Sequence, residues 1–366
     1  MTSTANQIPR DQIRRILIIK WSALGDIAIA SAIMEDIAAS FPNAEIHLNT
    51  LPGNLRLFKY DPRFKEVFAI DVRKKGERWS NNLAWISKVR SGRYDLLIDL
   101  QRSDHSRGLL VLLWLSGNAA KYRLGNLGGF PYTYQPTIRD PRARAMDMMR
   151  SALEPLAIPA QATHPVFYAS DSQLERVNSI RKRYGLDDGT YVVMLPGSQP
   201  AGFLKRWGTD NYVKLARLLH ASGMEKVVLI SGPDELDVCE EIAKTGDFVA
   251  NLTDVDLLEI GPLCAGAAAI IGNDTGNLHF AAGSNRPVLE ICGPTDPRRV
   301  KPIGDSVYAI QATLPCINCY LKFCNNPDDH ACMKAITPEW IAEQVPALAT
   351  GSFKAGQLFL NGLRSF

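Results

Sequence analysis

Short apolar runs alternate with longer stretches of mixed polarity along the first half of the chain. Residues 15–20, 46–49, 67–70 and 94–100 are rich in Ile, Leu and Val and are short enough to be buried strands. Residues 27–40 have the length and composition of a helix. Strands that alternate with helices of about 10–15 residues predict a parallel sheet covered by helices on both faces.

A second series with the same alternation follows residues 153–169, where three prolines fall close together and the pattern weakens. This stretch is predicted to be an interdomain linker. Further strands are expected at 191–195, 226–230, 268–271 and 287–291, and helices at 172–184, 210–221, 235–244 and 257–265. The sequence therefore predicts an α/β protein with two Rossmann-like, doubly wound domains, residues 1–160 and 161–345, that face each other across a ligand-binding cleft.

Length and charge agree with this organisation. The 366 residues suit two domains, and the balance of 41 basic and 38 acidic side chains, net +3, is too mild to argue for a nucleic-acid partner. The polar start and the short apolar runs resemble neither a signal peptide nor a membrane span, which needs roughly 18 apolar residues. A cytoplasmic protein is expected, with at most peripheral membrane contact.

The segment Ser22-Ala23-Leu24-Gly25-Asp26 follows the first expected strand and opens the first expected helix. Gly25 allows a tight turn with close approach of the backbone to a ligand. Asp26 can be interpreted as a helix N-cap or as a carboxylate that acts as a general base. The segment lacks the second and third glycines of a dinucleotide fingerprint, which disfavours a dehydrogenase.

The loop after the strand at 191–195 combines Pro196-Gly197-Ser198 with Lys205-Arg206-Trp207. Gly197 and Ser198 can present backbone and hydroxyl donors to a phosphate, and Lys205 can neutralise it. The loop is longer than most strand-to-helix connections, which favours a function. A solvated basic loop is the alternative.

The segment from Gly272 to His279 gives the strongest local signal. It joins a strand to a helix, and the N-terminal amides of a helix suit a pyrophosphate. Its candidate donor-binding residues are Asp274, Thr275, Gly276 and His279. Asp274 is expected to cap the turn or bind a sugar hydroxyl, and His279 can equally be a buried core residue. Thr295, after the next strand, can supply a further hydroxyl.

Two other groups of residues carry weaker signals. Arg102 and Arg107 belong to basic clusters in the first half that would suit an anionic acceptor, although most such charges only solvate a surface. Four cysteines lie within 17 residues near the end of the chain: Cys316, Cys319, Cys324 and Cys332. They could bind a metal ion, but the second pair lacks the C-x2-C spacing of zinc sites. A cluster of reduced thiols is the simpler interpretation.

Taken together, these motifs resemble glycosyltransferase family 9, the heptosyltransferases that build the lipopolysaccharide inner core. The matching segments are residues 16–26, Pro196-Gly197-Ser198 with Lys205-Arg206-Trp207, Asn273-Asp274-Thr275-Gly276 with His279, and Gly293-Pro294-Thr295-Asp296-Pro297. Each motif is weak alone, but their order and spacing over residues 14–345 are specific. Gly208, Asn277 and Leu278 depart from the usual family pattern.

The resemblance implies a GT-B fold and inverting, metal-independent transfer of a heptose from ADP-heptose to an anionic glycolipid acceptor. It implies that Asp26 is the base and that Lys205 and the turn from Asp274 to His279 hold the donor. Gly25, Arg102 and Arg107 would then face the acceptor, no cofactor is expected, and the enzyme would work at the inner face of the inner membrane. Residues 346–366 are expected to pack back on the first domain.

Three alternatives share these motifs. One is a transferase for another nucleotide sugar or for a protein acceptor, and the second is a GT-B-like epimerase that turns over the donor without an acceptor. The third is a non-catalytic paralogue that binds sugar nucleotides, which the presence of Asp26 and Lys205 disfavours.

Overall fold

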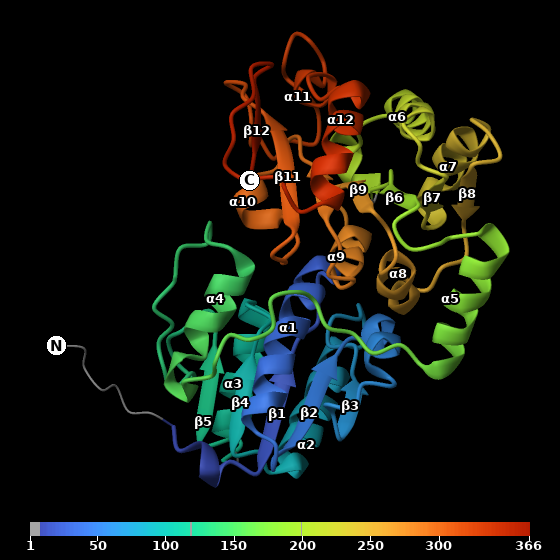
Figure 1. Ribbon diagram of the computed structural model, residues 1–366. Helices are drawn as coiled ribbons and strands as arrows, with labels where there is room; N and C mark the ends of the chain where they lie inside the picture. The colour runs from blue at the N-terminus through green and yellow to red at the C-terminus, as the bar shows by residue number, and fades with distance from the viewer. Residues whose placement is uncertain (1–7, 118, 199) are drawn as a thin grey trace. The chain divides into compact units, whose positions relative to one another are not determined.

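The protein was analysed as a computed structural model that describes residues 8–117, 119–198 and 200–366. The chain divides into two compact units, Met1–Tyr168 and Ala169–Phe366, and each is built around its own sheet. Figure 1 shows the sheet of each unit with helices packed against it. The predicted α/β class with two parallel-sheet domains is confirmed.

The first unit contains a five-stranded parallel sheet in the order β3-β2-β1-β4-β5. Its strands are β1 (Arg15–Ile19), β2 (Glu45–Thr50), β3 (Glu66–Ala69), β4 (Leu96–Asp99) and β5 (Tyr122–Gly125). Strand order reverses at β1, so the carboxyl ends of β1 and β4 flank the topological switch point. Ligands of open α/β sheets bind at such a point.

The helices of the first unit are α1 (Leu24–Ser40), α2 (Arg78–Gly92), α3 (Asp104–Leu115) and α4 (Ala145–Ala152), with short 3-10 turns at Arg10–Gln12, Pro52–Phe58 and Glu154–Leu156. Helix α1 buries most of its length, from Ile27 to Ile37. It packs against α4, whereas α2 and α3 pack against each other. One core of the unit joins the β1 side chains Leu17 and Ile19 to Trp85 of α2 and Leu109 of α3.

The second unit contains a seven-stranded sheet in the order β12-β11-β10-β9-β6-β7-β8. Its strands are β6 (Tyr191–Leu195), β7 (Lys226–Ile230), β8 (Val249–Leu252), β9 (Ala269–Asn273), β10 (Val288–Ile291), β11 (Val307–Ala312) and β12 (Leu363–Ser365). All pairings are parallel except that of β12 with β11. Here the switch point lies between β6 and β9.

Helices of the second unit follow most of these strands. They are α5 (Asp171–Tyr184), α6 (Thr209–Ala221), α7 (Leu236–Ala243), α8 (Leu257–Cys264), α9 (Gly276–Ala282), α10 (Pro297–Val300), α11 (Ala331–Lys334) and α12 (Pro338–Ala349), with 3-10 turns at Pro200–Lys205 and Pro233–Glu235. Helix α5 has a capping box between Ser170 and Gln173 and ends at Gly185 in the left-handed conformation. The alternation predicted from the sequence is therefore present in both units.

The end of the chain, which was expected to pack back on the first domain, pairs within the second unit. Strand β12 pairs antiparallel with β11 and completes the edge of the second sheet, with Leu363 fully buried. Phe353 is also buried in the core of the second unit. Backbone pairing and the burial of these two side chains give the tail a place within its own unit.

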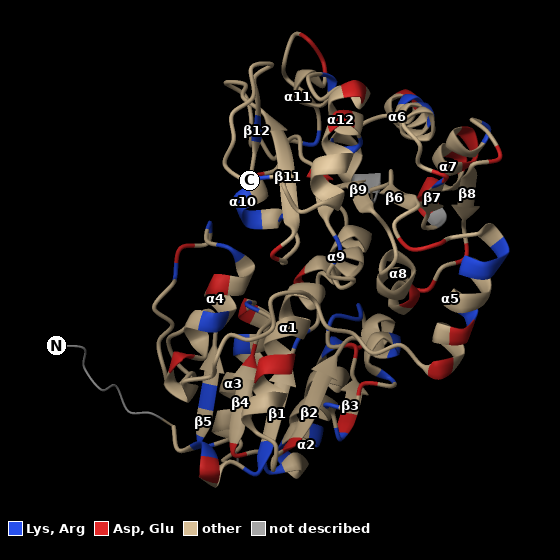
Figure 2. Ribbon diagram, in the orientation of Figure 1, with Lys and Arg blue, Asp and Glu red and all other residues tan. Residues whose placement is uncertain are grey.

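Basic and acidic residues occur throughout the chain. Figure 2 shows both kinds interspersed over the elements of both units. Within the described ranges, no helix combines the length and the apolar character that crossing a bilayer requires.

Candidate active site

One candidate region lies in the first unit, at the carboxyl ends of β1 and β4. The loop that joins β1 to α1 is held by side chains from several other segments. The Gln101 side-chain oxygen accepts hydrogen bonds from the backbone N–H groups of Trp21, at 2.7 Å, and Ser22, at 2.9 Å. Asn54 donates to the Trp21 carbonyl at 2.6 Å, and Arg73 donates to the Ser22 hydroxyl at 2.9 Å. The loop that precedes Asp26 is thus held in place by side chains that follow β2, β3 and β4.

Asp26 is the third residue of α1, and its side chain remains 47% exposed. Its Oδ2 accepts a long hydrogen bond, 3.4 Å, from the backbone N–H of Ala23. The N-cap residue is Ala23, so the interpretation of Asp26 as the N-cap is wrong. Asp26 supports the helix start only weakly, and its carboxylate stays half-exposed. A half-exposed carboxylate at a switch point can accept a proton from a bound hydroxyl.

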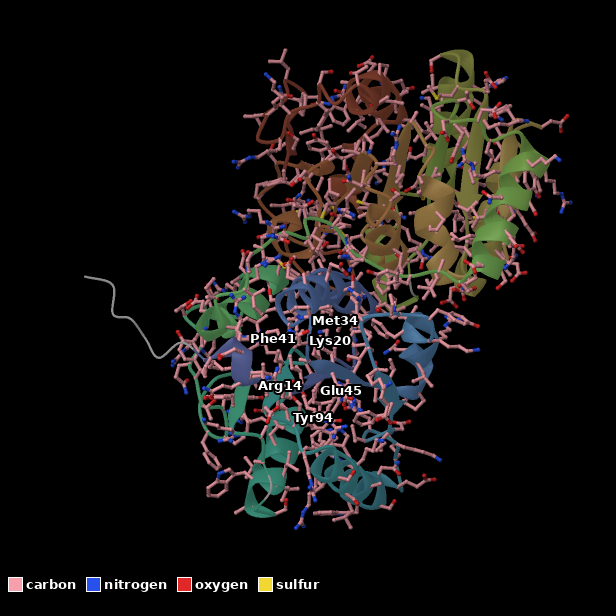
Figure 3. The ribbon with its side chains drawn as sticks, turned by 60° about the horizontal axis from the view of Figure 1, so that its bottom comes forward. Arg14, Lys20, Met34, Phe41, Glu45 and Tyr94 are labelled. Carbon is pink, nitrogen blue, oxygen red and sulfur yellow. The ribbon has the colours of Figure 1, made fainter. Side chains whose placement is uncertain are left out.

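Lys20, the residue directly after β1, lies beneath this carboxylate. Its side chain is only 2% exposed, and its Nζ lies 4.0 Å from Asp26 Oδ2 and donates to the Leu100 carbonyl at 3.2 Å. Figure 3 shows Lys20 inside the first unit. Burial lowers the pKa of Lys20, and the carboxylates of Asp26 and Asp99 oppose this effect. Burying an ammonium is costly unless opposite charge lies nearby, and the carboxylates of Asp26 and Asp99 supply that charge.

The predicted acceptor residues lie along the segment that follows β4. Arg102 has a left-handed backbone, with φ of 49°, and its buried Nε has no hydrogen-bond partner among the described residues. Arg107, on α3, lies 3.7 Å from the exposed carboxylate of Asp104. The ring of His105 contacts that of Trp21 edge-on, with centroids 5.7 Å apart. The β1–α1 loop and the start of α3 therefore form one region, with Gly25 in the first turn of α1.

The other candidate region lies in the second unit, at the carboxyl ends of β6 and β9. Asn273, the last residue of β9, holds its loops together. Its side-chain nitrogen donates to the carbonyls of Pro196 and Gly197, and its oxygen accepts from the Trp207 backbone at 3.2 Å and the Tyr212 hydroxyl at 3.1 Å. One buried amide thus fixes both ends of the loop that contains Lys205.

Lys205, Asp274 and Thr295 meet in this region from three different segments. The Lys205 Nζ lies 2.7 Å from Asp274 Oδ2, and the Thr295 hydroxyl donates to the same oxygen at 2.8 Å. Asp274 and Thr295 are buried, whereas Lys205 is 27% exposed. The arrangement holds an accessible ammonium in a fixed position, where it can neutralise an anionic group.

Gly197 is needed for a close contact within this region. A Cβ at position 197 would lie 1.9 Å from Cγ of Glu235, whose carboxylate accepts from the Gly232 backbone N–H at 2.7 Å. Ser198 is buried and donates from its hydroxyl to the Gly202 carbonyl at 2.9 Å. The Ser198 hydroxyl therefore fastens the loop in this structure.

The remaining predicted donor residues open α9. Thr275 is its N-cap residue and Gly276 its first residue. His279 lies on α9 and is buried, as expected if it is a core residue. The β9–α9 turn thus places Asp274 and the first amides of α9 at the same edge of the sheet as Lys205.

A buried carboxyl lies beside this region. Glu290 on β10 is fully buried, and neither of its oxygens has a hydrogen-bond partner among the described residues. Burial raises its pKa well above the ordinary value, and the charge of Asp274 adds to the effect. Glu290 therefore carries a proton at neutral pH, because the ionised form would be an unpaired buried charge.

The four cysteines at the start of the last segment do not form a metal site in the part of the chain that is described. Cys316 and Cys319 are exposed, whereas Cys324 and Cys332 are half-buried, and all four are free thiols. No three His, Cys, Asp or Glu side chains of the described ranges come together in a way that could hold a metal ion.

Sequence reasoning missed Lys20, Gln101, Glu235 and Glu290. A signal for Lys20 exists, since a lysine that ends an apolar strand just before a glycine turn is placed in the interior by the strand itself. Glu290 has a similar signal, because it is the charged residue in the otherwise apolar strand Val288–Ile291. Gln101 and Glu235 act through contacts that their local sequence does not indicate.

Comparison with known proteins gives a consistent result. The family model described as glycosyltransferase family 9 (heptosyltransferase) matches residues 83–329, about two thirds of the chain. The chain is 24% identical to lipopolysaccharide heptosyltransferase 1 of Pseudomonas aeruginosa, over 91% of this chain and 98% of that protein.

Solved structures agree with the fold. The crystal structure of the family 9 glycosyltransferase from Veillonella parvula matches with a TM-score of 0.75 and 18% identity, covering 93% of this chain and 98% of that one. The E. coli heptosyltransferase WaaC with ADP matches with a TM-score of 0.67 and 19% identity, covering 91% and 99%. The expected GT-B fold is thereby confirmed.

Proposed function

Because the chain belongs to glycosyltransferase family 9 (heptosyltransferase), we propose that it transfers a heptose from ADP-heptose to a lipopolysaccharide inner-core acceptor. The chain is a glycosyltransferase, and the names of its relatives support this choice of donor and acceptor. A lipid-linked acceptor would place the reaction in the cytoplasm, at the inner face of the inner membrane.

The observation that carries the proposal is the cluster of Lys205, Asp274 and Thr295. When the sugar–phosphate bond breaks, negative charge accumulates on the departing diphosphate, and a preorganised cation stabilises it. Lys205 is accessible and is held by Asp274 at 2.7 Å, so its ammonium is already positioned before the donor binds. With this cation and the backbone amides at the start of α9, the leaving group needs no divalent metal.

The other donor-binding residues have supporting roles in the proposal. Gly197 allows the backbone to approach the donor, and Ser198 and Thr295 hold the loops that surround Lys205. Glu235, buried against Gly197, is a suitable acceptor for the vicinal hydroxyls of a ribose, which carboxylates bind in other nucleotide sites. Thr275, Gly276 and His279 complete the donor site around the β9–α9 turn.

Asp26 is the general base of the proposed mechanism. The acceptor hydroxyl is a poor nucleophile until its proton is removed, and the half-exposed Asp26 carboxylate can remove it. Direct attack on the anomeric carbon from the face opposite the diphosphate inverts its configuration. Gly25, Arg102 and Arg107 would bind the anionic acceptor, to which the 43% exposed side chain of Arg107 is open.

The test measures heptose transfer and ADP binding in the same variants. Asp26→Asn is expected to reduce transfer by about 100-fold or more, the usual contribution of a general base, with ADP affinity unchanged. Asp147→Asn is the matched control, because Asp147 is the third residue of α4 as Asp26 is of α1. Lys205→Met is expected to weaken ADP binding instead.

The outcomes separate the parts of the proposal. If Asp26→Asn retains transfer, the base is another residue. If it loses ADP binding together with transfer, Asp26 serves the fold or the donor site. If the wild-type protein consumes ADP-heptose equally well without an acceptor, the proposed transfer to a lipopolysaccharide acceptor is wrong.

A further inference from the structure

Helix α2 begins with two large apolar side chains that are exposed. Trp79 is 79% exposed and Leu83 is 64% exposed. Residues four positions apart lie on the same face of a helix, so the two side chains form one apolar patch. Such exposure of a tryptophan is unusual, because Trp is highly buried on average.

Basic residues precede this patch along the chain. Arg73, Lys74, Lys75 and Arg78 are all exposed, and Glu77 is the single acidic residue in residues 73–83. Lys74 pairs with Glu77 at 2.6 Å, whereas Lys75 and Arg78 make no ion pair with any described residue. Residues 73–83 therefore combine exposed apolar side chains with an excess of unneutralised positive charge.

We propose that residues 73–83, the docking surface, bind the protein to an anionic lipid bilayer. Tryptophan prefers the boundary between headgroups and acyl chains, where its ring is buried and its N–H is hydrated. Leucine inserts beside it, and lysine and arginine are attracted to anionic headgroups. The three preferences are met together on the first turns of one helix and the loop before it.

A bilayer fits this surface better than a protein partner does. A specific protein interface usually buries more than about 1,000 Å² and has few charges at its centre. Two apolar side chains within a segment that contains four basic residues provide neither feature. Charge complementarity with phosphatidylglycerol or a similar lipid requires only that the headgroups be anionic.

The chain contains a matched control for the apolar part of this surface. Trp114 and Leu115, at the end of α3, are 45% and 66% exposed. No Lys or Arg occurs among residues 109–117. This second exposed Trp–Leu pair is therefore not expected to bind anionic vesicles, because it lacks the cations.

The experiment is flotation of the full-length protein with vesicles of phosphatidylcholine alone or mixed with phosphatidylglycerol. Binding is expected only to the anionic vesicles and should decrease in 1 M salt, where charges are screened beyond about 3 Å. The W79S/L83S variant should lose about tenfold or more in affinity. The K75Q/R78Q variant should lose about fivefold for each charge removed, and W114S/L115S should bind like the wild type.

Several results would overturn the proposal. They are equal binding to neutral vesicles, absence of binding to anionic vesicles, or unchanged binding by W79S/L83S or K75Q/R78Q. A change of oligomeric state in W79S/L83S would instead assign the patch to a protein interface. Circular dichroism of each variant excludes unfolding, and because the vesicles contain neither donor nor acceptor, the result is independent of the proposed transfer.

Discussion

At the scale of single residues, the positions of two buried ionisable groups lead to predictions. Lys20 lies under Asp26 with its ammonium 4.0 Å from the carboxylate. In Lys20→Met the carboxylate loses the cation that lies beneath it. The rate constant for transfer should therefore fall, by up to about 100-fold as for a misplaced reacting group. ADP affinity should stay unchanged, because the proposed donor residues lie in the second unit.

A purely structural role for Lys20 gives a different result, since a destabilised fold would lose ADP binding together with transfer. Lys88→Met is the control, because Lys88 also pairs with a carboxylate, that of Glu66, away from the candidate site. Its rate of transfer and its ADP affinity should match those of the wild type. Steady-state kinetics and ADP titration of both variants make the comparison.

Glu290 gives a prediction about stability. Its pKa is raised in the folded protein, so the unfolded chain releases this proton first as the pH rises. Above the ordinary value near 4.5, its contribution to stability declines by about 1.4 kcal/mol per pH unit until the folded-state pKa is reached. Glu290→Gln keeps the shape without the proton. It should therefore be more stable than the wild type at neutral pH, by a margin that shrinks toward pH 5.

Denaturant unfolding of the wild type and Glu290→Gln at several pH values tests this prediction. A constant difference across the range would mean that Glu290 does not titrate in this way. Glu339→Gln is a suitable control, because the Glu339 side chain is half-exposed and pairs with Lys214.

At the scale of secondary-structure elements, strand β12 can be removed without touching either candidate region. Ending the chain before residue 354 deletes β12 and the fully buried Leu363. The loss of a buried leucine alone costs about 2–5 kcal/mol, and the edge of β11 becomes exposed. Hydrogen exchange should therefore accelerate in Val307–Ala312, while Arg15–Ile19 in the first unit stays protected. Faster exchange in β1 instead would place the tail on the first unit after all.

The elements that the sequence predicted are those in which burial determines the pattern. β1, β4, β6, β7, β9 and β10 lie inside their sheets, and nearly every side chain in them is apolar. β2 was predicted as well, and so was the edge strand β3, whose residues are mostly apolar. The edge strands β5, β8 and β12 were missed, because a half-exposed edge tolerates residues such as Arg123, Asn251 and Arg364. β12 is a strand only because it pairs with β11, about 50 residues earlier in the chain. The sequence analysis did not predict β11 either.

The same reasoning applies to the candidate sites. Glycines and polar residues after strands located both regions, because parallel topology brings the carboxyl ends of strands together. The contacts of Gln101 with Trp21 and of Asn273 with Pro196 join segments about 80 residues apart. Such contacts depend on the register of neighbouring strands, which local periodicity does not determine.

At the scale of the whole molecule, the two-unit organisation predicts which unit a nucleotide binds and stabilises. The proposed donor residues all lie in the second unit, and the proposed base lies in the first. ADP at about 100 times its dissociation constant should stabilise the fold by roughly 2.7 kcal/mol. UDP, GDP and CDP at the same concentration should have smaller effects, because the proposal names an adenine nucleotide.

Thermal unfolding with the four nucleotides, combined with hydrogen exchange, separates the possible outcomes. Selective stabilisation by ADP, with protection of residues 202–206 and 273–279, supports the proposed donor and its place. Stabilisation by UDP or GDP alone keeps a transferase and rejects ADP-heptose. Lys205→Met should abolish the effect of ADP while Lys214→Met, on the surface of α6, should not. An equal loss in both variants would mean that general electrostatic attraction, and not the ammonium held by Asp274, binds the diphosphate.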